Sequence, residues 1–120
     1  MSKILIVDDA LFMRKVIRDL LIEHNYTDLI EAGSGKEAVE MFNEHRPDLI
    51  IMDITMPAFD GIETIKVIRK IEEEVTILMC SAMGQESMVK EALKLGAKDF
   101  IVKPFKQERM MQAIKKLLGD

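Results

Sequence analysis

The stretch Lys3-Ile4-Leu5-Ile6-Val7-Asp8-Asp9 is a short apolar run that ends on two carboxylates. Three later runs have the same form, because each is apolar and leads into a polar side chain. They are residues 48–52 before Asp53, residues 75–80 before Ser81, and residues 99–102 before Lys103. Continuous apolar runs are typical of parallel strands that are buried on both faces. If the runs are neighbouring strands, their polar ends meet at one edge of the sheet, where such sheets bind ligands.

Between these runs, apolar residues recur at the spacing of a helix. We expect helices at residues 11–24, from Ser34 to about His45, after Gly61, up to Gly96, and at residues 107–118, with a weaker strand at residues 27–32. Ser34 followed by Glu37 is typical of a helix-capping box. Alternating strands and helices indicate an α/β fold of five βα units, with a parallel sheet and right-handed crossovers.

Length and composition narrow the class of protein. The 120 residues are expected to form one domain, 1–120, and 48% of them are hydrophobic, which suffices for a core. The net charge of −4 argues against binding to nucleic acid or to an anionic membrane. One cysteine excludes a disulfide framework. Because no signal peptide or membrane-length apolar run is seen, we expect a cytoplasmic protein. We also expect it to be a monomer.

Asp8, Asp9 and Asp53 indicate a metal site. Three carboxylates in one pocket repel each other unless a cation balances their charge. Mg²⁺ suits such a pocket, because it binds one or two carboxylates and leaves room for water and phosphate oxygens. Taken alone, Asp8-Asp9 is also typical of a solvated helix N-terminus. The match with Asp53 at a second strand end favours the metal.

Asp53 has two candidate roles, as a metal ligand or as a nucleophile toward a phosphoryl group. Lys103 would neutralise the phosphoryl oxygens and Ser81 would donate a hydrogen bond to one of them. Taken singly, Lys103 is explained as a counter-ion of the acids and Ser81 as a helix N-cap. As a set at different strand ends, they favour phosphoryl chemistry. The Lys103-Pro104 bond is expected to be trans, since only about 5–6% of X–Pro bonds in folded proteins are cis.

Five motifs closely resemble the receiver domain of bacterial and archaeal two-component response regulators. They are Val7-Asp8-Asp9, residues 52–57 (Met-Asp-Ile-Thr-Met-Pro), Asp60-Gly61, Ser81-Ala82 and Lys103-Pro104-Phe105. The resemblance covers essentially the whole chain, so a receiver domain without an output domain is expected. Residues 80–85 and 96–105 are similar to stand-alone chemotaxis regulators of the Thermotoga, Gram-positive or archaeal type. The resemblance implies a flavodoxin-like three-layer sandwich with strand order 2-1-3-4-5.

The resemblance also implies a chemistry. Asp53 would accept a phosphoryl group from a phosphohistidine on a CheA-like sensor kinase. Asp9, Asp53 and the backbone carbonyl of Thr55 would bind Mg²⁺, and Asp8 would act through water. The protein would assist its own phosphorylation and autodephosphorylation without being a conventional enzyme. A dedicated phosphatase is a further candidate partner.

Ser81, Lys103 and Phe100 match the switch of this family. Ser81 and Lys103 would grip the phosphoryl group, and movement of Ser81 would open space for Phe100. A partner that prefers the switched surface would then shift the population toward it.

The output surface is expected on the helix that ends at Gly96, the last strand and the last helix. Val89, Phe100 and Met111 are expected to form an exposed apolar trio there. Nearby lysines suit a helical, acidic segment of the partner, such as a flagellar-motor switch protein. They are Lys90, Lys94, Lys106 and Lys115.

Other functions fit less well. An FMN electron carrier needs a phosphate loop rich in hydroxyls and glycine where this chain has Asp8-Asp9. A dehalogenase-type phosphohydrolase needs a second Asp two residues after its nucleophile, where this chain has Thr55. A plain adaptor would respond normally after Asp53→Asn. A stand-alone receiver in a phosphorelay outside chemotaxis remains the alternative.

Overall fold

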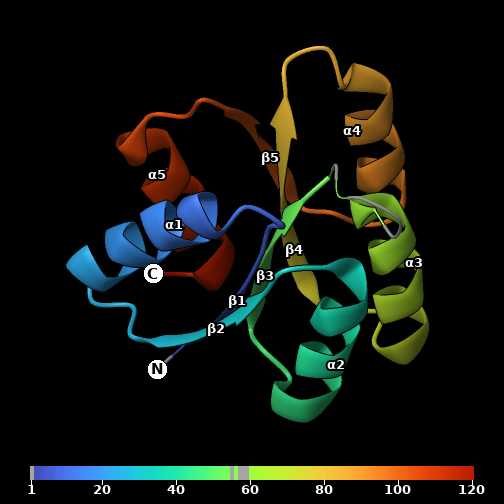
Figure 1. Ribbon diagram of the computed structural model, residues 1–120, viewed down its shortest axis with the longest axis horizontal. Coiled ribbons are helices and arrows are strands. Elements are labelled where there is room, and N and C mark those ends of the chain that lie inside the picture. Colours follow the sequence, from blue (N-terminus) through green and yellow to red (C-terminus); the bar gives the residue numbers. More distant parts are fainter. Residues whose placement is uncertain (1, 55, 57–59) are drawn as a thin grey trace.

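The computed structural model describes residues 2–54, 56 and 60–120, in which five strands alternate with five helices (Figure 1). The strands are β1 (Lys3–Val7), β2 (Asp28–Ala32), β3 (Leu49–Asp53), β4 (Thr76–Ala82) and β5 (Asp99–Lys103). The helices are α1 (Leu11–Glu23), α2 (Gly35–His45), α3 (Gly61–Ile71), α4 (Glu86–Lys94) and α5 (Gln107–Leu118). All the elements expected from the sequence are present.

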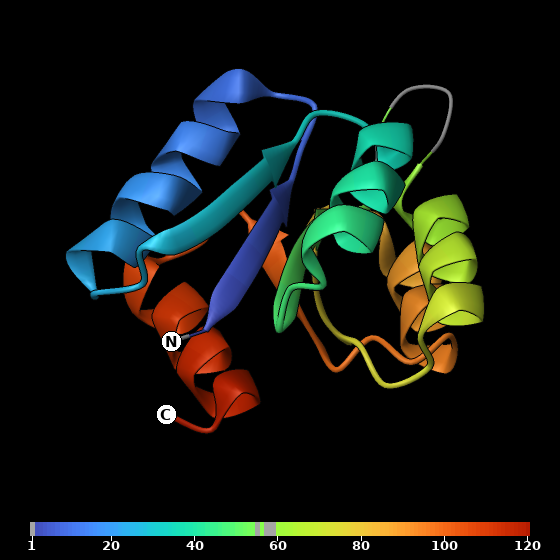
Figure 2. The same cartoon turned by 90° about the horizontal axis from the view of Figure 1, so that it is seen from below.

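The strands form one parallel sheet in the order β2-β1-β3-β4-β5, which confirms the flavodoxin-like fold class. Helices α1 and α5 cover one face, and α2, α3 and α4 cover the other, so the sheet is the middle of three layers (Figures 1 and 2). Two strand ends differ from the expected bounds, since β4 extends to Ala82 and β5 to Lys103. Ser81 and Lys103 therefore lie within strands. In the described part of the chain, no helix combines the length and apolar character needed to cross a membrane.

Successive side chains of β3 enter opposite sides of the sheet. Ile50 and Met52 join the apolar cluster under α2, α3 and α4, whereas Leu49 and Ile51 join the cluster under α1 and α5. All four are at most 1% exposed, which explains why this run lacks polar alternation. The next position on the α1 and α5 side is Asp53, so the same alternation sets the direction of this carboxylate.

Side-chain caps fix the starts of α2 and α3 near the carboxyl edge of the sheet. Ser34 Oγ accepts the Glu37 backbone N–H at 3.1 Å, as the capping box predicts. The Glu37 carboxylate accepts the Gly33 N–H at 2.8 Å, one residue before the position a standard box would use. Asp60 caps α3 by accepting the Glu63 N–H at 2.9 Å. Such caps typically contribute about 1 kcal/mol each.

The start of α3 packs directly on the end of β3 at Gly61. The Gly61 N–H donates to Ile54 O at 2.8 Å. A Cβ at this position would lie 2.8 Å from Ile54 Cα and 2.9 Å from Ile54 O, and it would also clash with Asp53 O. These are backbone atoms, which cannot swing away as the tip of a side chain can. The missing side chain therefore allows α3 to approach the strand that carries Asp53.

We expect Gly61→Ala to lower the free energy of unfolding by about 1–3 kcal/mol, the usual cost of overpacking. Urea denaturation measures the loss. Lys70→Ala is the control, because Lys70 is exposed on the same helix and its loss should change stability by no more than about 0.5 kcal/mol. An unchanged midpoint for Gly61→Ala would show that α3 does not need this close approach.

Candidate functional site

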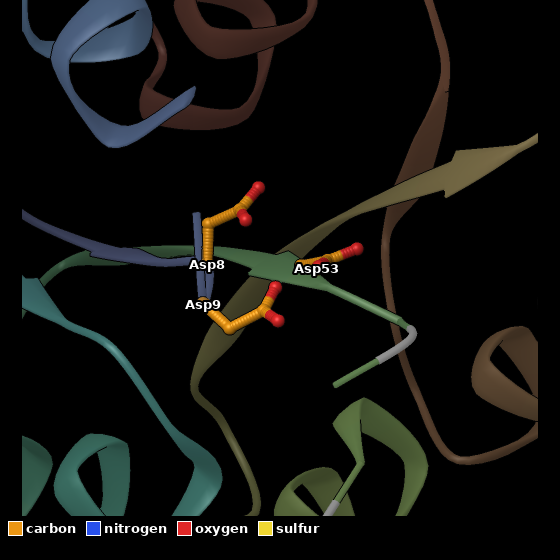
Figure 3. Close-up of side chains that lie close together, drawn as sticks. All are labelled: Asp8, Asp9 and Asp53. Atoms are coloured by element: carbon orange, nitrogen blue, oxygen red, sulfur yellow. The ribbon is translucent and has the colours of Figure 1, made fainter. Parts of the chain in front are cut away.

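The structure brings together the three acids that the sequence singled out (Figure 3). Asp8 follows β1 and Asp53 ends β3, and the strand register pairs Val7 with Met52. Asp8 is therefore level with Asp53 across the two strands. One carboxylate oxygen from each of Asp8, Asp9 and Asp53 lies within 4.8 Å of the others.

Lys103 is the cation beside these acids. Its Nζ lies 2.8 Å from Asp8 Oδ2 and 3.5 Å from Asp53 Oδ1. Burial lowers the pKa of Lys103, but the hydrogen bond to Asp8 and the charges of Asp53 and Asp8 outweigh burial, so the net pKa is raised. Lys103 is therefore an ammonium at neutral pH. The Lys103–Pro104 peptide bond is cis, contrary to the expectation from base rates.

Asp8 and Asp9 have different surroundings although they are adjacent. Asp8 is only 2% exposed, and its Oδ1 accepts the Ala10 N–H at 2.9 Å while its Oδ2 contacts Lys103. Asp9 is exposed, and among the described residues its carboxylate has no hydrogen-bond or ion-pair partner. Asp8 is thus held in place, whereas the Asp9 side chain is available to a ligand from solvent.

The chemistry of the donors fits a hard divalent cation. Three carboxylates and one ammonium leave a formal excess of two negative charges in the cluster, and all the donors are oxygens. Asp9 and Asp53 are the two carboxylates that Lys103 contacts least closely. The predicted backbone donor, Thr55, lies outside the described residues.

Asp53 and Cys80 are two nucleophilic side chains in this region, and they are paired in the register of β3 and β4. Burial raises the pKa of Cys80 to about 12; the charge of Lys103 opposes this rise, and the charges of Asp53 and Asp8 add to it. The thiol is therefore protonated at neutral pH and a poor nucleophile. This leaves Asp53 as the better candidate nucleophile.

Ser81 is a buried residue of β4, 1% exposed, and not a helix cap. The N-cap of α4 is Gln85, so the alternative that explained Ser81 as a cap is wrong. Alternation along β4 places Ser81 on the side of Met79, which packs in the cluster that also contacts Phe100. Ser81 and Phe100 both line a groove between α4 and β5. Ser81 therefore lies at the groove, on the opposite side of the sheet from Asp53 and Lys103.

The expected apolar trio is not an exposed surface. Val89 is 8% exposed and Met111 is 4% exposed, while Phe100 is half-buried. Met111 packs beside Met110 in the cluster under α1 and α5. One step along a helix turns the side chain by about 100°, and the core-facing stripe is itself about that wide. Two successive residues can therefore both be buried, which the expectation overlooked.

The groove between α4 and β5 replaces this trio as the candidate output surface. It has a volume of about 500 Å³ and is lined mainly by apolar groups. Three apolar side chains at its border are exposed: Met83 by 81%, Val102 by 41% and Leu93 by 40%. Val89 and Phe100 form part of its wall, and Lys90 and Glu86 add one charge of each sign.

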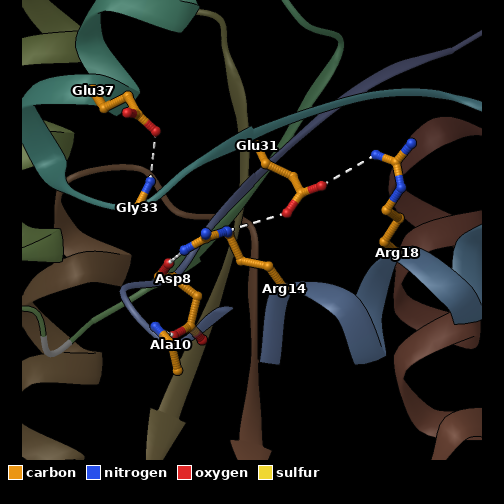
Figure 4. A network of polar contacts seen from close by, with 7 residues as sticks. All are labelled: Asp8, Ala10, Arg14, Arg18, Glu31, Gly33 and Glu37. Carbon is orange, nitrogen blue, oxygen red and sulfur yellow. Dashed lines mark hydrogen bonds and ion pairs between the residues drawn. The ribbon is translucent and has the colours of Figure 1, made fainter. Parts of the chain in front are cut away.

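A second polar cluster lies beside the acids and was missed from the sequence (Figure 4). Arg14 and Arg18 on α1 both contact Glu31 on β2, at 3.1 Å and 3.2 Å. Arg14 also donates to the backbone carbonyl of Asp8. Arg14 and Arg18 are four residues apart and therefore lie on one face of α1. This spacing is the feature of the sequence that could have indicated a shared partner. Their partner is on a separate strand, so the contact follows only from the packing of α1 on the sheet.

Comparison with known proteins agrees with this geometry. The response regulator receiver domain family matches residues 4–115. The chain is 54% identical to the chemotaxis protein CheY of Bacillus subtilis over 117 residues, which are 98% of each chain. It is 51% identical to the chemotaxis protein CheY of Thermotoga maritima over 116 residues, which are 97% of each chain.

A solved structure with the same fold is the chemotaxis protein CheY4 of Vibrio cholerae. It superposes with a TM-score of 0.90 at 29% identity, and the match covers 98% of each chain. The family match and the CheY relatives include the strand ends at which the acids, Ser81 and Lys103 lie. This chain therefore belongs to the response regulator receiver domain family, as a CheY-like response regulator of two-component signalling.

Proposed function

We propose that Asp53 accepts a phosphoryl group from a phosphohistidine of a CheA-like histidine kinase. A carboxylate oxygen of Asp53 bonds to phosphorus while the bond from phosphorus to the imidazole nitrogen breaks. The imidazole leaves with that electron pair and takes up a proton. The observation that supports this most directly is the Asp53 carboxylate beside the Lys103 ammonium, at 3.5 Å, in a chain with CheY relatives.

The same site would reset itself. Attack of water on phosphorus breaks the bond to Asp53, returns the carboxylate and releases inorganic phosphate, while water's protons pass to the phosphate and to solvent. The chain is then a phosphoryl acceptor with autodephosphorylation, and a dedicated phosphatase is a proposed further partner.

Asp9 and Asp53 would hold Mg²⁺, with the Thr55 carbonyl as a further proposed donor and Asp8 acting through water. When bound, the ion neutralises charge on the phosphoryl oxygens. Lys103 supplies another positive charge, and its hydrogen bond to Asp8 at 2.8 Å already holds it in place. Such preorganised charge needs little rearrangement during transfer.

Ser81 and Phe100 would carry the signal to the groove between α4 and β5. The Ser81 hydroxyl donates a hydrogen bond to an oxygen of the new phosphoryl group and shifts toward it. This movement makes space for the Phe100 ring within the groove that both residues line. A partner that binds the altered groove better shifts the population toward it.

The groove suits the apolar face of an amphipathic helix. Its wall is mainly apolar, and Met83, Leu93 and Val102 are exposed at its border. Lys90 can pair with an acidic side chain of that helix, and Glu86 can pair with a basic one. Because the similar relatives are chemotaxis proteins, a flagellar-motor switch protein is the proposed output partner.

The direct test is incubation with acetyl phosphate and Mg²⁺, followed by intact-mass spectrometry. We expect the unmodified chain to gain one phosphoryl group and Asp53→Asn to gain none, because the amide is not a nucleophile. Asp19→Asn is the matched control, since Asp19 is exposed on α1 and should leave uptake unchanged. Equal uptake by Asp53→Asn would refute Asp53 as the acceptor.

Mg²⁺ should bind without phosphate, and Asp9→Ala should weaken binding more than Asp8→Ala. Asp9 is the exposed acid that we propose as a direct ligand, whereas Asp8 is already engaged by Lys103 and the Ala10 N–H. We expect a difference of about tenfold in the dissociation constant, or about 1.4 kcal/mol. Isothermal titration calorimetry on metal-free protein measures it. Equal or reversed losses would contradict the assignment of Asp9.

Lys103→Ala should still accept phosphoryl groups but should not switch the groove. Uptake is expected to slow by about 10- to 100-fold, below the usual cost of losing an oxyanion-hole donor, because Mg²⁺ still neutralises charge. The amide NMR shifts of Leu93 and Val102 after beryllofluoride addition report the switch, with Lys36→Ala, exposed on α2, as control. Normal groove shifts in Lys103→Ala would reduce Lys103 to a counter-ion.

A further inference from the structure

The Arg14 guanidinium is fixed by groups from two strands at the acidic edge of the sheet (Figure 4). Its Nε contacts Glu31 Oε1 on β2 at 3.1 Å, and its Nη1 donates to the Asp8 carbonyl after β1 at 2.6 Å. The Glu31 carboxylate is oriented in turn by Arg18, at 3.2 Å from its other oxygen. Charge-assisted hydrogen bonds of this kind are among the stronger ones in proteins. The Arg14 side chain is only 17% exposed.

The chain leaves room for this guanidinium at Gly33. A Cβ at that position would lie 3.2 Å from Arg14 Nη1, which is tighter than an ordinary contact. The Gly33 N–H is itself held by Glu37 at 2.8 Å. The turn between β2 and α2 therefore forms a fixed wall on which Arg14 lies.

The carbonyl that Arg14 contacts belongs to the peptide group joining Asp8 to Asp9. The orientation of that peptide group sets the direction in which the Asp9 side chain leaves the backbone. The Asp8 carboxylate has separate supports in Lys103 and the Ala10 N–H. The Asp9 carboxylate has no such support among the described residues, so the backbone beneath it is its main constraint.

We propose that Arg14, oriented by Glu31, is a positioning residue for metal binding: it holds the Asp8–Asp9 peptide group so that the Asp9 carboxylate faces Asp53. This inference rests on the proposed function, because it concerns the same Mg²⁺ site. Arg14 touches neither the metal nor the phosphoryl group in this role. It acts through the backbone of Asp9.

Because Arg14 is positively charged, its two possible effects on Mg²⁺ affinity, positioning of Asp9 and electrostatic repulsion of the ion, have opposite signs. A guanidinium near the acids repels a divalent cation, so removing its charge alone would tighten Mg²⁺ binding. Loss of positioning would instead weaken Mg²⁺ binding, because the Asp9 side chain would then have to lose conformational freedom when the metal binds. Removing a group that orients a metal ligand typically weakens metal affinity by about 10- to 100-fold.

The experiment is calorimetric Mg²⁺ titration of metal-free Arg14→Met, Arg14→Lys and Lys15→Met, each first shown to be folded by its amide NMR spectrum. We expect about tenfold weaker Mg²⁺ binding for both Arg14 variants, including the lysine, which keeps the charge but lacks the planar fork. Lys15→Met is the matched control, because Lys15 lies on the same helix but pairs with the exposed Asp19 and contacts neither Glu31 nor Asp8, so its affinity should stay within about twofold of the unmodified chain. If Arg14→Met does not fold, Glu31→Gln replaces it and should also weaken binding.

Unchanged or tighter Mg²⁺ binding by the Arg14 variants, or an equal loss in Lys15→Met, would overturn the positioning role. This failure is distinct from failure of the proposed function. If the unmodified chain does not bind Mg²⁺ at all, the metal site itself is wrong. If it binds Mg²⁺ and loses binding in Asp9→Ala but not in Arg14→Lys, only the role of Arg14 is wrong.

Discussion

The ion pair between Lys103 and Asp8 is the interaction on which the rest of the site depends. Asp8 is 2% exposed, and a buried carboxylate without a partner is strongly destabilising. Lys103 Nζ provides that partner at 2.8 Å and lies 3.5 Å from Asp53 at the same time. From the end of β5, Lys103 thus contacts Asp8 after β1 and Asp53 at the end of β3. It also leaves the acidic cluster incompletely neutralised, which is the condition under which a divalent cation binds favourably.

Alternation along the strands separates the chemistry of the site from its readout. Asp53 continues the side of Ile51 and Lys103 continues the side of Ile101, both in the cluster under α1 and α5. Ser81 points to the opposite side, toward the groove lined by Phe100. A group attached to Asp53 at the edge of the sheet can be approached from both sides. In the proposed function, Ser81 connects the acidic cluster to the surface near α4 at this edge.

The polypeptide around Asp9 combines a fixed backbone with a free side chain. Arg14 holds the peptide group before Asp9, and the Ala10 N–H after it is held by the Asp8 carboxylate. The Asp9 carboxylate itself is exposed. For the proposed Mg²⁺ site, a carboxylate arranged in this way would lose little backbone entropy on binding, and no existing ion pair of Asp9 would have to be broken. Gly61 fixes the backbone near the second acid, because its missing side chain lets α3 pack against the end of β3 that carries Asp53.

By itself the sequence determined the order of strands and helices and the meeting of Asp8, Asp9 and Asp53. Continuous apolar runs predict parallel strands, and parallel strands bring their carboxyl ends to one edge whatever the details of packing. Only the tertiary structure decided that Ser81 lies inside β4, that Val89 and Met111 are buried, and that Arg14 and Glu31 support the acidic edge. Those features depend on how each helix is rotated on the sheet and on contacts between separate elements. A rotation of one residue, about 100°, turns an exposed helix position into a core position, and local spacing does not specify it.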